Sequence, residues 1–200
     1  LTVTQMLWVN LIMDTFAALA FASLPPSMEV MKNKPRRSTD FILSRQMIYR
    51  ILSTGVLFMV ILFGLMQCFR NNDVESLSHL VKYPGIYFHS MFEFNGGGEL
   101  TPVELSMFFS IFVFFQIWNL FNAKAFESGH TAFFNLKGSK VFFLVVLGII
   151  IGQYVIVTIG GQIFSVTPLS RVNWGFFIST TLLIWIVLSS FYLIKIKIFK

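Results

Sequence analysis

Long apolar stretches separated by short polar segments form the main pattern along the chain. Each stretch has about 20 residues, the length that an α-helix needs to cross about 30 Å of hydrocarbon. The pattern predicts an all-α, polytopic membrane protein, with five transmembrane helices forming one bundle in a single domain over residues 1–200. The five predicted spans are residues 4–23, 47–68, 104–123, 140–159 and 174–194.

Composition agrees with this pattern, since 56% of the residues are hydrophobic and only 12% are charged. Such values are typical of membrane proteins and leave no segment long enough for a separate soluble domain. The net charge of +6 does not indicate nucleic-acid binding, because the basic residues lie beside the apolar spans. The first span begins almost at once without a charged leader, so we expect a piece of a longer chain rather than a signal peptide.

The distribution of lysine and arginine predicts the orientation of the spans. Twelve of the fifteen basic residues lie in or next to the loops 24–46 and 124–139 and in the tail after residue 194. Basic residues accumulate in cytoplasmic loops, so these two loops and the C-terminus are expected to be cytoplasmic. Segments 69–103 and 160–173 would then lie outside, and the longer of them is expected to hold a short surface helix.

Two polar side chains, Asn10 and Asp14, interrupt the first apolar span. A carboxylate at the bilayer centre costs about 2.5–3.5 kcal/mol on insertion scales, so it is kept where it meets a partner, a cation or a proton path. A spacing of four residues puts both side chains on one helix face. Because amide and carboxylate oxygens are ligands that calcium prefers, the pair predicts half of an ion site. The alternative is an interhelical hydrogen bond, although no Lys or Arg lies inside the five predicted spans to pair with Asp14.

Three amides recur every three residues in the third span, at Gln116, Asn119 and Asn122. A hydrogen-bonded helix seam and ion coordination are equally open for Gln116, whereas the seam is favoured for the two asparagines. Asn122 lies near the end of the span, where it could instead cap the helix. Gly148 and Gly152 form a GxxxG pattern that permits close helix contact, although this pattern is common by chance.

Four segments carry a resemblance to a known family: QMLWVNLIMDT at 5–15, the prolines and basic residues of the loop that follows, FVFFQIWN at 112–119 and GGQIFS at 160–165. In order, they resemble the sixth helix, the loop after it, the eighth helix and the last outer loop of P-type calcium-transporting ATPases of the plasma-membrane type (type IIB). The whole chain resembles helices six to ten of the C-terminal membrane domain of that family.

The resemblance implies roles for particular residues. Asn10 and Asp14 would be calcium ligands on a helix that unwinds near the ion, and Gln116 would make a lesser contribution. Met13 and Gln116 stand where two-site members carry a threonine and a glutamate, which implies one calcium site here. No residue of the chain is expected to be catalytic or to bind a cofactor.

The resemblance also implies the setting. Calcium would be the transported ion, while ATP and magnesium would bind in parts of the pump that this chain lacks, so the fragment alone has no catalytic machinery for this translocase. Loop 24–46 would couple the ion site to the phosphorylation domain. The partners would be the lipid bilayer and the remaining pump domains, with no nucleic acid, in a multi-pass protein of the plasma (bacterial inner) membrane.

Two alternatives stay open at the level of sequence. One is a non-enzymatic membrane module, and the other is part of an ion-coupled secondary transporter. Secondary transporters often contain inverted repeats with broken helices, and no internal repeat relates the five predicted spans.

Overall fold

The computed structural model of the chain describes residues 1–25, 41, 43–72, 74, 80, 82–94, 97–128 and 138–198. Every regular element in these ranges is a helix and none is a strand, which agrees with the predicted all-α class. Most of the predicted loop 24–46, part of the loop 124–139 and the last two residues lie outside the described residues. Predictions for those positions stay predictions.

Among the described residues, three helices are long and apolar enough to cross a membrane. They are α3 (Arg45–Asn71), α6 (Pro102–Ser128) and α7 (Lys140–Ile159). The predicted spans 47–68, 104–123 and 140–159 fall inside these three candidate spans. Helix α3 begins two residues early because Ser44 caps it: the Ser44 hydroxyl accepts a hydrogen bond of 3.2 Å from the Met47 N–H.

The first and last predicted spans do not form long, uniformly apolar α-helices like α3, α6 and α7. The first consists of three consecutive elements, α1 (Val3–Asn10), the π-helical turn η1 (Leu11–Phe16) and α2 (Ala17–Ala22). The last lies in α9 (Arg171–Ile198), whose described apolar stretch is shorter than those of the three spans. The structure therefore shows three candidate membrane spans, and the count of five stays a prediction.

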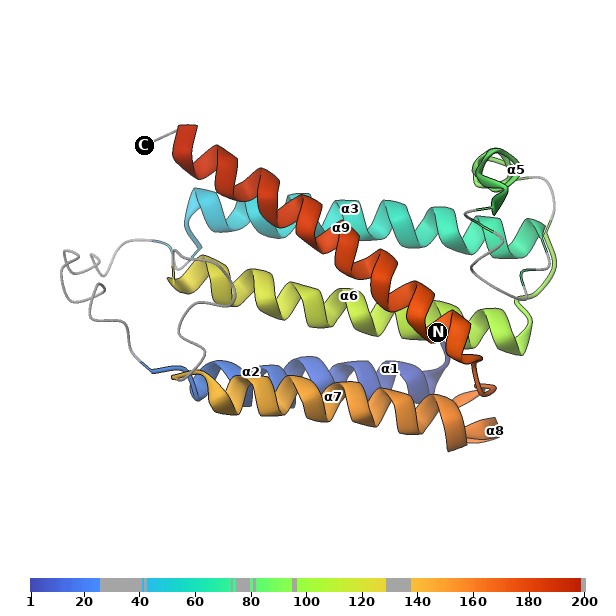
Figure 1. Cartoon of the computed structure of the whole chain (residues 1–200), viewed down its shortest axis with the longest axis horizontal. Coiled ribbons are helices and arrows are strands. Elements are labelled where there is room, and N and C mark those ends of the chain that lie inside the picture. The colour runs from blue at the N-terminus through green and yellow to red at the C-terminus, as the bar shows by residue number, and fades with distance from the viewer. Residues whose placement is uncertain are drawn as a thin grey trace.

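Helix α6 lies at the centre of the fold (Figure 1), with α3 on one side and α1, α2 and α7 on the other. Helix α9 crosses the bundle obliquely and packs against α6. One apolar cluster joins α1 and α2 to α6 and α7, and a second joins α3, α6 and α9. In the second, the rings of Phe58 and Phe115 stack with centroids 4.6 Å apart.

The outer surface of the bundle is strongly apolar. Met59 of α3 is 66% exposed, and Leu144 of α7 is 64% exposed. Side chains of this kind, repeated along helices of membrane-spanning length, suit contact with lipid rather than water. The apolar helices and their apolar outer faces are those of an integral membrane protein.

Two short helices lie outside the long ones. The helix α5 (Pro84–Ser90) confirms the short helix expected in segment 69–103. The helix α8 (Gly161–Phe164) was not expected, and it directly follows α7. The loop after α8 turns sharply because Ser165 adopts a left-handed backbone conformation with φ of 51°.

Lys124 departs from its predicted place in a solvated loop. It lies within α6 and is only 4% exposed. Its ammonium group lies 5.6 Å and 5.3 Å from the ring centroids of Phe142 and Phe143 at the start of α7. The lysine stem is long and apolar enough to lie along such rings, so this basic side chain can be buried near the end of α6.

Candidate ion-binding site

Helix α1 is fixed at its first turn before it reaches the candidate ligands. Thr2 and Gln5 form a reciprocal capping box at its N-terminus. The Gln5 amide Nε2 also donates a hydrogen bond of 2.8 Å to the carbonyl of Phe164 in α8. The Thr4 hydroxyl donates one of 2.7 Å to the carbonyl of Ile163. The start of α1 is therefore attached to the turn that follows α7.

The helix widens immediately after Asn10. Residues Leu11–Phe16 form the π-helical turn η1, in which the Ala17 N–H bonds the Ile12 carbonyl five residues earlier. π-Helical turns are rare and are frequent at functional sites. The resemblance implied an unwound helix here, and the structure instead has a wider but hydrogen-bonded turn. The bonded form has a physical reason, since backbone groups without partners are costly in apolar surroundings.

Asn10 is exposed, and its side chain makes no hydrogen bond with any described residue. The interhelical hydrogen bond considered for Asn10 is therefore absent from the described part of the chain. The exposed positions of this segment recur three or four residues apart, including Val3, Leu7, Asn10 and Leu11. The backbone of Asp14 lies inside η1, and its side chain lies outside what the structure describes.

The three amides of α6 have different surroundings. Asn122 Oδ1 accepts a hydrogen bond of 2.8 Å from the Trp185 indole and one of 3.2 Å from the Ser189 hydroxyl, both in α9. The seam prediction is therefore confirmed for Asn122, and the cap alternative is wrong because α6 continues to Ser128. Gln116 and Asn119 are half-buried, and neither side chain hydrogen-bonds to a described residue. No hydrogen bond joins Gln116 to Asn10.

Sequence reasoning missed the buried amide of Gln153 in α7. It is fully buried, and its Oε1 accepts a hydrogen bond of 3.0 Å from the Trp8 indole N–H. A single amide within the most apolar helix was the available signal, because such a group needs an internal partner. Within the described ranges, no group of three or more His, Cys, Asp or Glu residues lies close enough to hold a metal ion. The described side chains therefore supply at most part of an ion site.

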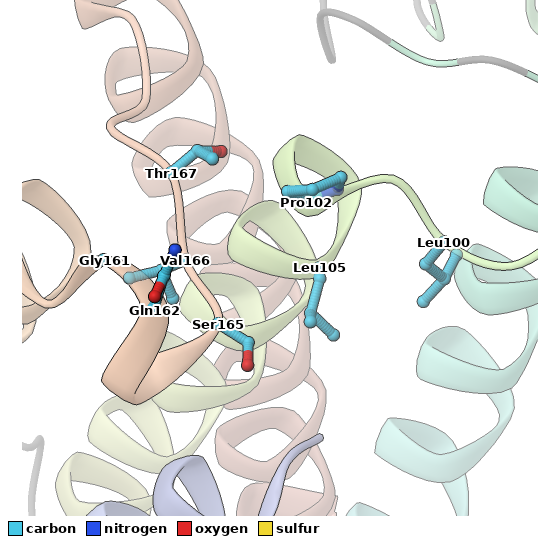
Figure 2. A pocket seen from close by; sticks show the side chains of 8 residues that line it. All are labelled: Leu100, Pro102, Leu105, Gly161, Gln162, Ser165, Val166 and Thr167. Atoms are coloured by element: carbon cyan, nitrogen blue, oxygen red, sulfur yellow. The ribbon is translucent and has the colours of Figure 1, made fainter.

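A concave feature lies at the end of the bundle near α8 (Figure 2). It is a hollow of about 410 Å³ between the start of α6 and the turn after α7. The residues that line it are Leu100, Pro102, Leu105, Gly161, Gln162, Ser165, Val166 and Thr167. Its polar side chains are those of Gln162, Ser165 and Thr167, and the rest of the lining is apolar or glycine.

Comparisons with known proteins give a consistent result. Human plasma membrane calcium-transporting ATPase 3 is 32% identical over 190 residues, which cover 92% of this chain and 14% of the relative. Plasma membrane calcium-transporting ATPase 2 of Oreochromis mossambicus is 34% identical, with coverage of 87% and 14%. Calcium-transporting ATPase PAT1 of Dictyostelium discoideum is 33% identical, also with coverage of 87% and 14%.

The chain thus spans 14% of the length of these curated relatives. The family described as "Cation transporting ATPase, C-terminus" matches residues 1–196, nearly the whole chain. This match includes the π-helical turn and the helices that surround it. The chain belongs to the cation transporting ATPase C-terminal family.

Proposed function

We propose that this chain is the C-terminal membrane part of an ATP-driven calcium pump and that Asn10 and Asp14 supply oxygen ligands to one calcium ion. The observation that carries the proposal is the π-helical turn Leu11–Phe16, which begins directly after Asn10 and contains Asp14. A local widening of a membrane helix next to an amide and around a carboxylate is an arrangement that suits an ion site. The names of the relatives support calcium as the ion.

The exposure of Asn10 supports a partner beyond this chain. An amide that faces lipid and makes no hydrogen bond is costly, so the exposed face of α1 suits contact with further transmembrane segments of the pump. Calcium takes six to eight oxygen ligands, and two side chains cannot complete its shell. The remaining ligands would come from those segments. Gln116 would contribute less than Asn10 and Asp14.

We extend the proposal to five membrane crossings, adding α1–η1–α2 and α9 to the three candidate spans. Figure 1 supports the orientation, since the ends of α2 and α6 and the starts of α3 and α7 lie at one end of the bundle. Arg45, Lys124 and Lys140 belong to that end, which would be cytoplasmic. The membrane would be the plasma (bacterial inner) membrane.

The remaining parts of the mechanism follow from the same proposal. ATP and magnesium would act in cytoplasmic domains, and loop 24–46 would transmit phosphorylation to the turn at Leu11–Phe16. A change in that turn would alter the distance between Asn10 and Asp14 and release the ion to the outside. No observation in the described ranges favours a secondary transporter or a non-enzymatic module over this function.

Calcium-dependent phosphorylation by ATP tests the proposal in the full-length pump. Asp14→Asn removes a charged ligand while keeping the side-chain shape, so the calcium concentration for half-maximal phosphorylation should rise at least about tenfold. The matched control is Thr158→Val in α7, an exposed threonine whose hydroxyl bonds only its own helix at Tyr154. Phosphorylation by inorganic phosphate without calcium reports whether each variant is folded. Wild-type calcium affinity in Asp14→Asn would contradict the proposed site.

A further inference from the structure

The indole of Trp8 lies where α1 meets the π-helical turn. Its ring nitrogen donates a hydrogen bond of 3.0 Å to Oε1 of Gln153, which is fully buried in α7. Its backbone carbonyl accepts a hydrogen bond from the Leu11 N–H, which bonds both the Leu7 and the Trp8 carbonyls. The Leu11 N–H thus divides its hydrogen bond between an α-type partner, Leu7, and a 3₁₀-type partner, Trp8, at the start of the π-helical turn.

The other side of the same indole reaches the far end of the turn. Phe16 is the last residue of η1, and its ring meets the Trp8 ring edge to face with centroids 6.4 Å apart. Trp8 thus contacts both ends of η1, through its backbone carbonyl at Leu11 and through its ring at Phe16. A shift of the indole would move the Phe16 end of this turn relative to α7.

Gly152 of α7 leaves the space in which the Trp8 indole lies. A Cβ atom added at Gly152 would lie 2.8 Å and 3.0 Å from two carbons of the Trp8 six-membered ring. Contacts that short force one group to move, so only glycine allows the indole to lie at this depth. By contrast, a Cβ at Gly148 would meet no atom within 4 Å. Of the two glycines in the GxxxG pattern, only Gly152 makes a close contact. That contact is with the Trp8 ring and not with the backbone of another helix.

Gln153 is itself held in one orientation. Its Nε2 lies 3.5 Å from the Ser110 hydroxyl of α6, a long hydrogen bond. The Ser110 hydroxyl in turn donates 2.8 Å to the Ser106 carbonyl. Because the amide nitrogen is directed to α6, the amide oxygen is directed to Trp8. The acceptor of the indole is therefore fixed by two helices.

We infer that Trp8 and Gln153 are positioning residues that hold the π-helical turn in its ion-binding geometry and thereby set the calcium affinity of the pump. The inference rests on the proposed function and adds to it a contact outside the ligand set. The indoles of Trp118 and Trp185 also donate hydrogen bonds between helices, but these bonds join α6 and α9 and do not contact η1.

The test compares variants of the full-length pump. Gln153→Met keeps the length and volume of the side chain but removes the acceptor, whereas Gln153→Glu keeps an oxygen facing the indole. Trp8→Phe removes the N–H and keeps a ring. The matched control is Thr181→Val, which removes the acceptor of the Trp118 indole, also at 3.0 Å, between α6 and α9.

Two readouts separate positioning from general stability. The first is the calcium concentration for half-maximal phosphorylation by ATP, and the second is the amount of phosphoenzyme formed from inorganic phosphate without calcium. Gln153→Met should raise the calcium concentration for half-maximal phosphorylation by roughly 3- to 10-fold, the equivalent of one lost buried hydrogen bond. The amount of phosphoenzyme formed from inorganic phosphate should stay near that of the parent. Gln153→Glu should restore most of the affinity, and Thr181→Val should not change it.

A double-mutant cycle makes the assignment specific. If Trp8 and Gln153 act through one hydrogen bond, Trp8→Phe combined with Gln153→Met should shift calcium affinity no further than the stronger single variant. If Gln153→Met fails to fold, Gly152→Ala displaces the indole without removing a polar group and should give the same direction of shift.

Unchanged calcium affinity in folded Gln153→Met or Gly152→Ala, with Asp14→Asn still impaired, would overturn this inference alone. Shifts in the double variant that equal the product of the two single shifts would also overturn it. A parent protein without calcium-dependent phosphorylation would instead contradict the proposed function. The two failures are thus distinguishable.

Discussion

The indole N–H of Trp185 in α9 donates a hydrogen bond of 2.8 Å to Oδ1 of Asn122 in α6, across 63 residues of sequence. The Ser189 hydroxyl donates to the same oxygen at 3.2 Å. The Trp185 ring also stacks on Trp118 of α6, with centroids 5.4 Å apart. One amide oxygen therefore serves two donors where the oblique helix α9 crosses the central helix, and this makes Asn122 a structural residue.

Replacing Asn122 by leucine should destabilise the protein. The Trp185 N–H and the Ser189 hydroxyl would both lose this acceptor in an apolar setting, at a cost of about 1–3 kcal/mol. Thermal unfolding of the purified protein in detergent measures the effect as a lower midpoint. The comparison variant Asn122→Asp keeps an acceptor oxygen and should lose less stability. Equal midpoints for Asn122→Leu and the parent would contradict the structural role.

Glu104→Gln should also destabilise the protein, for a different reason. The Glu104 carboxylate is 1% exposed and accepts three hydrogen bonds, from the Val74 N–H and from the Thr101 N–H and hydroxyl. An amide has only one acceptor oxygen, so at least one donor would face an NH₂ group, at about 1–3 kcal/mol. The same thermal measurement applies, with the exposed Glu99→Gln as control. A variant as stable as the control would show that the carboxylate is not needed.

Gly97→Ala should loosen the segment that returns from α5 to α6. Gly97 has a φ of 108°, and an added Cβ would lie 3.0–3.1 Å from the Cβ and carbonyl of Arg70 and from the Asn71 side chain. Backbone strain of this kind costs about 1–3 kcal/mol. Gly98→Ala is the matched control, because a Cβ there meets nothing within 4 Å. Limited proteolysis should cut Gly97→Ala faster than Gly98→Ala, and equal rates would rule out the strain.

Gln116→Ala should weaken calcium affinity less than Asp14→Asn does. Gln116 is half-buried and makes no hydrogen bond among the described residues, so its amide is available as a supplementary ligand. A neutral amide contributes less than a carboxylate to a divalent ion, so a shift of about 3-fold or less is expected. Calcium-dependent phosphorylation measures it. A loss as severe as that of Asp14→Asn would make Gln116 a direct and essential ligand.

The long helices were predictable because apolar runs of about 20 residues are too long for a strand or a short buried helix and fit a membrane-spanning helix. Their ends were less so. Helix α6 begins two residues before the predicted span because Thr101 and Glu104 form a local capping arrangement. The Thr-x-x-Glu signal for this helix start is present in the sequence at residues 101–104. The burial of Lys124 could not be predicted from its neighbours in sequence, because it depends on the rings of Phe142 and Phe143 in α7.

The candidate site was only partly predictable. Polarity within an apolar run identified Asn10 and Asp14, whereas no local signal marks the π-helical turn that follows Asn10 and contains Asp14. Its hydrogen-bond pattern depends on how neighbouring helices hold the segment, and the Trp8–Gln153 contact joins residues 145 positions apart. Contacts at such separations are set by tertiary packing, which periodicity does not encode.

The most direct test of the account is ATP-driven uptake of calcium-45 into inside-out vesicles that contain the full-length protein, with and without Asp14→Asn. The account predicts uptake by the parent and its loss in the variant, while phosphorylation by inorganic phosphate without calcium persists in both. Unchanged uptake in Asp14→Asn would contradict the account and make the Asn10–Asp14 pair a packing feature.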